Sequence, residues 1–136
     1  MREFSAQLVA EHGLTINDYE ALFLLARSED QRLRRVDLAA GLLLTASGIT
    51  RLLDGLESAG LVDRAACASD RRVVYAVLTD AGRARLEAAS DSHIAAVRDL
   101  FEGRYSEDEL TQLADLLSRL PGAEDAAGED CSIPSA

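Results

Sequence analysis

The chain has 136 residues, of which 48% are hydrophobic and 4% aromatic, and its formal net charge is −10 at neutral pH. This length suits one domain with a full core, and the composition predicts helices packed through leucine and alanine. We find no apolar run long enough to cross a membrane and no charged-then-apolar signal sequence at the start. We therefore expect a cytoplasmic protein.

The first predicted elements are two short helices. Residues 1–12 carry a brief apolar face, and Gly13 ends that segment. The spacing of apolar residues then predicts a helix over Ile16–Arg27. Thr15 and Asp18, three residues apart, are typical of a capping box at its start.

The next segments predict a minimal strand over Gln31–Arg35 and a helix over Val36–Leu44. We expect this helix to bury four apolar side chains, Leu38, Ala39, Leu42 and Leu43.

A helix with two unlike faces follows and ends before Gly60. Its apolar stripe, spaced three and four residues apart, comprises Ile49, Leu52, Leu53 and Leu56. Its other face carries small polar groups and charges: Ser47, Thr50, Arg51 and Asp54. Thr45 and Ser47 are both candidate N-caps, and either would leave backbone N–H groups that can hold a phosphate.

Two β-rich runs come next, Leu61–Cys67 and Arg72–Leu78, joined across Ala68–Arg71. A helix with a polar outer face followed by a hairpin with arginines at its tip is typical of a winged helix-turn-helix. In that arrangement the helix enters the DNA major groove, and the wing contacts phosphates or the minor groove.

These residues also resemble a known family. Asp70-Arg71-Arg72, followed by Leu78-Thr79 and Gly82, is similar to the wing signature of the MarR family of bacterial transcriptional regulators, D-x-R and then L-T-x-x-G. The resemblance extends from about Leu14 to Leu120. It implies a mainly α fold with a small β-hairpin wing (α+β), in which the winged helix-turn-helix is flanked by N- and C-terminal dimerisation helices.

The C-terminal part predicts two more helices. Thr79 caps a long one from Asp80 to about Gly103, and a capping box from Ser106 to Glu109 opens another that continues to Leu120. Their apolar faces exceed what one winged helix needs for its own core, which argues for packing between subunits.

The expected organisation is one MarR-type domain over residues 1–120. Its reading head covers about 31–78, and its dimerisation helices cover about 1–12 and 80–120. Residues 121–136 form an acidic tail that we expect to be disordered.

The resemblance implies a homodimer on a pseudo-palindromic double-stranded DNA operator, acting as a repressor. The implied DNA-contacting residues are Thr45, Ser47, Thr50, Arg51, Asp70, Arg71 and Arg72. We expect Asp70 to orient Arg72 by a hydrogen bond. The family also implies a small anionic aromatic effector, for which His12 and Tyr19 are candidate pocket residues, although both also suit a packing role.

The sequence is compatible with several alternatives. Arg51 could pair with Asp54 on the helix surface, and Cys67 is either a redox-sensitive thiol near Arg71 and Arg72 or an ordinary strand residue. The acidic charge and a first helix shorter than the family's favour a rival function, a winged-helix protein-interaction module without DNA binding.

The chain also departs from the family at Val73, where relatives carry a small residue. No cluster of residues with metal-ligand spacing or catalytic arrangement stands out, so we expect neither a cofactor, nor a metal, nor an enzyme.

Overall fold

The computed structural model describes residues 2–121, and the rest of the predicted tail lies outside the described residues. The chain forms two compact units, one up to Asp91 and one from Ser92, and the division falls inside the long helix α5 (Asp80–Glu102).

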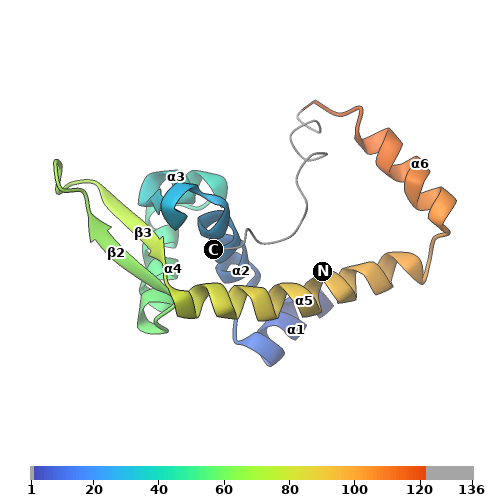
Figure 1. Ribbon diagram of the computed structural model, residues 1–136, viewed down its shortest axis with the longest axis horizontal. Coiled ribbons are helices and arrows are strands. Elements are labelled where there is room, and N and C mark those ends of the chain that lie inside the picture. The colour runs from blue at the N-terminus through green and yellow to red at the C-terminus, as the bar shows by residue number, and fades with distance from the viewer. Residues whose placement is uncertain (1, 122–136) are drawn as a thin grey trace. The chain divides into compact units, whose positions relative to one another are not determined.

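The first unit is a helical bundle with a small sheet (Figure 1). Before α5, its elements are α1 (Arg2–His12), α2 (Ile16–Arg27), a 3₁₀ turn η1 (Glu29–Gln31), β1 (Arg32–Arg34), α3 (Arg35–Gly41), α4 (Ala46–Ser58), β2 (Val62–Ala66) and β3 (Val74–Leu78). The three strands are antiparallel in the order β1-β3-β2, and the β2–β3 hairpin projects beyond the helices as a wing. This confirms the predicted class, mainly α with a β-hairpin wing in a winged-helix arrangement.

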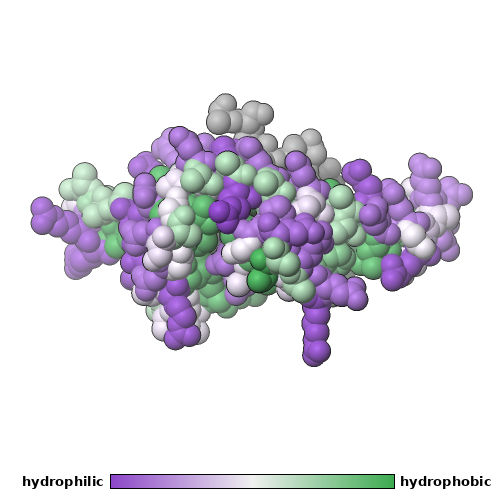
Figure 2. Space-filling view, turned by 90° about the horizontal axis from the view of Figure 1, so that it is seen from below, coloured by the Kyte–Doolittle hydropathy of each residue, from purple (hydrophilic) through white to green (hydrophobic). Residues whose placement is uncertain are grey.

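The second unit contains the end of α5 and α6 (Glu107–Leu117). Ser106 and Glu109 form the predicted capping box at its start. No described residue of α6 is buried, and apolar side chains lie at the surface of this unit, as the green atoms at the right of Figure 2 show. The prediction that α6 continues to Leu120 was wrong, because the helix ends at Leu117 with Ser118 as its C-cap.

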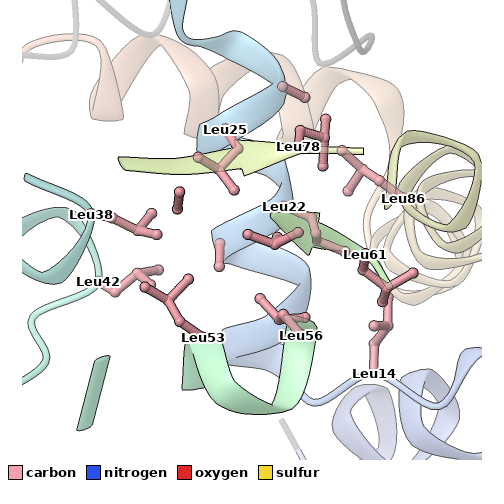
Figure 3. Close-up of a cluster of buried hydrophobic side chains, with 14 of the residues drawn as sticks. Leu14, Leu22, Leu25, Leu38, Leu42, Leu53, Leu56, Leu61, Leu78 and Leu86 are labelled. Carbon is pink, nitrogen blue, oxygen red and sulfur yellow. The ribbon is translucent and has the colours of Figure 1, made fainter. Parts of the chain in front are cut away.

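The core of the first unit gathers around α2. Ala21, Leu22 and Leu25 on this helix are fully buried. Leucines from the other elements surround them, and Figure 3 labels Leu14, Leu38, Leu42, Leu53, Leu56, Leu61, Leu78 and Leu86 among them. The buried hydrophobic residues among 2–121 are leucine, alanine, isoleucine and valine, as the composition predicted.

Helix α3 is shorter than predicted because the chain turns sharply after Gly41. Leu42 is buried, but Leu43 adopts φ = 53° and is 93% exposed, so its predicted burial was wrong. The N–H of Leu44 donates to the carbonyl of Ala39 at 2.9 Å and closes the turn. The middle leucine of this run therefore points outward while its neighbours contact the core.

Helix α4 ends in a Schellman motif. Gly60 has φ = 72°, a left-handed conformation that glycine adopts without steric cost. The N–H of Gly60 donates to Glu57, and the N–H of Leu61 donates to Leu56, each at 2.9 Å. The helix therefore stops where the first wing strand must begin.

The start of α5 is fastened to the end of α4. The hydroxyl of Thr79 accepts a hydrogen bond from the N–H of Gly82 at 3.0 Å and donates one to the carbonyl of Gly60 at 2.7 Å. A Cβ atom at Gly82 would lie 2.0 Å from the carbonyl oxygen of Leu61. Only glycine lets α5 approach the backbone this closely.

Among residues 2–121, no single helix is long and apolar enough to span a membrane. Only α3 and α4 counted together would have that length and hydropathy, and a bend of 106° separates them.

Replacing Gly82 with alanine should lower the free energy of unfolding by about 1–3 kcal/mol or more, because the added methyl group overlaps the Leu61 carbonyl. The matched control is Gly55→Ala, also within a helix, where an added Cβ meets nothing within 4 Å. That change should stabilise the fold by about 0.5–1 kcal/mol through the better helix propensity of alanine. Urea unfolding curves measure both, and equal effects would contradict the close approach at Gly82.

Candidate nucleic-acid interface

The polar face of α4 is the first part of the candidate interface. Ile49, Leu53 and Leu56 are buried against the core. Ser47 and Arg51, on the opposite side, are exposed, whereas the predicted stripe residue Leu52 is only partly buried. The amphipathic pattern therefore turns small polar groups and a guanidinium outward.

Thr45 is the N-cap of α4, which settles the choice between the two candidate caps. Its hydroxyl oxygen accepts a hydrogen bond from the N–H of Gly48 at 3.1 Å and lies 3.3 Å from the hydroxyl of Ser47. The N–H groups of Ala46 and Ser47 have no acceptor within the helix because they belong to its first turn. This helix start can accept a phosphate.

Thr50 and Arg51 differ in how freely they can bind a partner. The hydroxyl of Thr50 donates to the carbonyl of Ala46 at 2.8 Å, so only its oxygen lone pairs remain available. The Arg51 side chain forms no hydrogen bond or ion pair with any residue from 2 to 121. Its guanidinium keeps all of its donors for a partner outside the described chain.

The acids of α4 are paired by a residue that the sequence analysis did not single out. Arg64 on β2 forms an ion pair with Asp54, and its Nε lies 3.3 Å from a carboxylate oxygen of Glu57. The alternative pairing of Arg51 with Asp54 is therefore wrong. Since Arg64 lies ten residues beyond Asp54, no local sequence pattern indicates this contact.

The wing supplies the second part of the candidate interface. One carboxylate oxygen of Asp70 accepts hydrogen bonds from the backbone N–H of Arg72 at 3.0 Å and from its Nε at 3.2 Å. The Arg72 side chain is nevertheless 92% exposed, and Arg71 beside it is also exposed. The carboxylate thus fixes one edge of the Arg72 guanidinium and leaves the other edge open.

Cys67 lies at the base of the wing turn. Its Sγ is 3.1 Å from the hydroxyl of Ser69. That hydrogen bond, followed by contacts from the backbone of Ser69 and Asp70, lowers the pKa of the Cys67 thiol. The sequence predicted Arg71 and Arg72 as the source of this effect, but the cause is hydrogen bonding within the turn.

The two candidate effector residues lie in different environments. His12 lines an open recess of about 740 Å³ between the end of α1 and the start of α5, which we call the His12 recess. Arg85 lines it too, and its guanidinium donates to the carbonyl of His12 at 2.7 Å. Tyr19 does not line this recess, and its hydroxyl lies 3.0 Å from the hydroxyl of buried Ser90.

The exposed arginines and small polar groups of α4 and the wing suit a nucleic acid, which offers both phosphates and the hydrogen-bonding edges of its bases. Arg64 pairs with both Asp54 and Glu57 on α4 and offsets part of their negative charge, while Arg71 and Arg72 remain exposed on the wing. Within residues 2–121, no three His, Cys, Asp or Glu side chains are grouped as a metal site requires.

Comparison with known proteins supports the same interpretation. A family model described as "MarR family" matches residues 12–73. AbsC, a MarR family transcriptional regulator from Streptomyces coelicolor, is 37% identical, with 94% of this chain and 87% of AbsC covered and a TM-score of 0.72. Sco3205 from the same organism, a MarR family regulator crystallised in complex with DNA, is 30% identical, with 90% and 79% covered and a TM-score of 0.76. The HTH-type transcriptional repressor YetL of Bacillus subtilis is 36% identical, over 82% of this chain and 68% of YetL.

The lowered pKa of Cys67 predicts a shifted pH profile of thiol alkylation. Because a lower pKa raises the thiolate fraction at a given pH, the rate in the folded protein should rise at lower pH than in the urea-unfolded chain. Ser69→Ala should move the profile back toward the unfolded one, and Ser58→Ala serves as the distant control. The measurement uses a Cys131→Ser background so that only Cys67 reacts. Identical folded profiles with and without Ser69 would contradict the assigned cause.

Proposed function

The chain belongs to the MarR family of transcriptional regulators, and from that premise we propose that it binds a pseudo-palindromic DNA operator as a homodimer and represses transcription. The observation that carries the proposal is the pairing of an open, polar α4 face with a wing arginine held by Asp70. The name of YetL as a repressor supports repression, and the DNA in the Sco3205 structure supports DNA binding.

In this proposal α4 reads the major groove. Arg51, which has no protein partner among the described residues, and Ser47 reach base edges or flanking phosphates. Thr50 contributes as an acceptor because its hydrogen is bonded to Ala46. Thr45 holds the helix mouth near the backbone, since its hydroxyl caps α4.

The wing contacts the DNA beside the major groove. Asp70 restrains the Arg72 guanidinium, so less conformational entropy is lost when Arg72 meets a phosphate or the minor groove. Arg71 is exposed at the same turn and adds a second positive charge.

The second unit supports the homodimer. Phe101 on α5 and four leucines after it are at least 38% exposed: Leu113, Leu116, Leu117 and Leu120. Burying a side chain of this size contributes about 1.5–3 kcal/mol. Burial of several such side chains in each of two subunits can therefore contribute more free energy than the entropy of association costs. Two recognition helices would then lie about 34 Å apart on one face of the DNA.

The His12 recess supports regulation by a small anionic aromatic effector. The Arg85 guanidinium donates one N–H to the carbonyl of His12, and its other N–H groups can bind a carboxylate. Ala84 and Ala88 give the recess an apolar wall. Tyr19 acts in packing, through its contacts with Ser90 and Phe23. As a regulator of transcription, the protein would work in the cytoplasm.

The rival function is a winged-helix module that binds another protein instead of DNA, which the charge of −10 favours. A salt titration separates the two functions. For operator DNA, the logarithm of the binding constant should fall linearly with the logarithm of the salt concentration, with a slope of about −0.9 for each phosphate contacted. A chain that binds no DNA at low salt would favour the rival.

Arg51→Ala should change which bases are preferred, because a recognition-helix guanidinium at a base edge contributes about 1–3 kcal/mol of discrimination at one position. Arg51→Lys is the matched control that keeps the charge but loses the bidentate geometry. Affinities for a set of operators, each with one base pair changed, measure the effect. If every operator loses the same factor with Arg51→Ala, Arg51 contacts only phosphate.

Leu117→Asp should dissociate the dimer at micromolar concentration and abolish operator binding, because it places a charge in the exposed apolar face of α6. Gln112→Asp adds the same charge at another exposed position of α6 and should leave both properties unchanged. Sedimentation and operator binding report the two outcomes. A wild-type chain that sediments as a monomer would overturn the homodimer.

A further inference from the structure

A small recess lined by arginines lies between the wing and the start of α3. Its volume is about 90 Å³, and it is lined by Arg34, Arg35, Val36, Arg72, Val73 and Val74. The strand register brings these residues together. Arg34 pairs with Tyr75 in the antiparallel β1–β3 ladder, so the residues after Arg34 run beside those before Tyr75.

Two of the three arginines are held in place by carboxylates. The Nε and Nη2 of Arg34 donate to both carboxylate oxygens of Asp37, at 2.6 and 2.9 Å. The guanidinium of Arg72 makes a single such bond, from its Nε to one carboxylate oxygen of Asp70 at 3.2 Å. A guanidinium has five N–H donors, so each arginine retains donors for a further acceptor.

Arg35 completes the set without a carboxylate of its own. It is exposed, and its side chain forms no ion pair or hydrogen bond with residues 2–121. Of the three arginines that line the recess, Arg34 and Arg72 are paired with Asp37 and Asp70, so only the charge of Arg35 is not balanced by a carboxylate among residues 2–121. The positive charge is therefore concentrated where Arg35 stands.

The size and lining of the recess select the kind of ligand. A cavity of about 150 Å³ holds a benzene ring, so a recess of about 90 Å³ suits a smaller group such as a phosphate. The valines give the recess apolar walls, and Val36 is 61% exposed. A recess with apolar walls beside arginines suits the phosphate of a nucleotide, whose deoxyribose can contact the valines. A free, fully hydrated ion would gain nothing from those apolar walls.

We propose that Arg34, Arg35 and Arg72 form a cradle for one backbone phosphate of the bound DNA, between the wing and α3. The inference rests on the proposed DNA-binding function and adds Arg34 and Arg35 to its contact residues. Such a contact carries no sequence information, but it fixes the register of the reading head on the duplex. It also adds the end of β1 and the start of α3 to the wing contacts.

The test compares Arg35→Ala with the wild type over a series of salt concentrations. The variant should bind operator more weakly, and the slope of log K against log salt should become shallower by about 0.9 for each bound subunit. The loss should be the same factor for every base-pair variant of the operator. Arg32→Ala is the matched control: Arg32 lies three residues earlier on β1, pairs with Asp30 and stacks on Tyr75, outside this recess.

Neutral methylphosphonate groups, substituted one at a time along the operator, locate the contact. The wild type should lose affinity when one particular phosphate in each half-site is made neutral. Arg35→Ala should lose less affinity at that phosphate, because one of its three arginine contacts is already missing. If Arg35→Ala keeps the wild-type affinity and slope, the cradle is wrong while the proposed function stands. If the wild type binds no DNA, the proposed function fails and the cradle fails with it.

A second measurement separates DNA phosphate from a free anion. Inorganic phosphate should raise the melting temperature of the wild type and of Arg35→Ala equally. A stabilisation that disappears in Arg35→Ala, with the salt slope for DNA unchanged, would assign the recess to a free anion and overturn the proposal.

Discussion

The reading head depends on the contact between the start of α5 and the end of α4. Four structural features meet there: the left-handed turn at Gly60, the first residue of the wing, the end of β3 and the first turn of α5. Thr79 joins them, because its hydroxyl bonds both Gly60 and Gly82 while its N–H donates to the carbonyl of Leu61 at 3.2 Å. With no Cβ at Gly82, the helix can lie against that carbonyl. The end of α4 and the start of α5 are thus joined by the short Thr79 side chain and by the close backbone approach at Gly82, which leave little room for adjustment.

The chain has a net charge of −10, so the placement of its acidic residues decides whether its arginines can bind an anionic partner. Here carboxylates hold arginines in position: Asp70 holds Arg72, and Asp37 holds Arg34. The pairing is reversed on α4, where Arg64 from the wing neutralises Asp54 and leaves Arg51 open. Exposed ion pairs of this kind add little stability, so their main effect is to orient side chains.

Local features of the fold were predictable from the sequence, and contacts between distant segments were not. The capping residues Thr15, Thr79 and Ser106 follow from spacing within one turn, and the structure confirms all three. The sequence did not predict the left-handed turn at Leu43, because three consecutive leucines give no indication of which one is exposed. Similarly, neither Arg64 nor the pair Arg34 and Arg35 stands in any motif. Their positions follow from how the strands pair, which the hydrophobic pattern alone does not specify. The assignment of the DNA-contacting residues stays a prediction.

The account rests on one claim, that two copies of this reading head recognise one DNA site together. Selection of bound fragments from a pool of random DNA tests it most directly. The account predicts enriched fragments that share two inverted half-sites, with centres about 10–10.5 base pairs apart or a multiple of that spacing. Enrichment of single, unpaired half-sites would contradict the homodimer, and no enrichment over the starting pool would contradict sequence-specific binding itself.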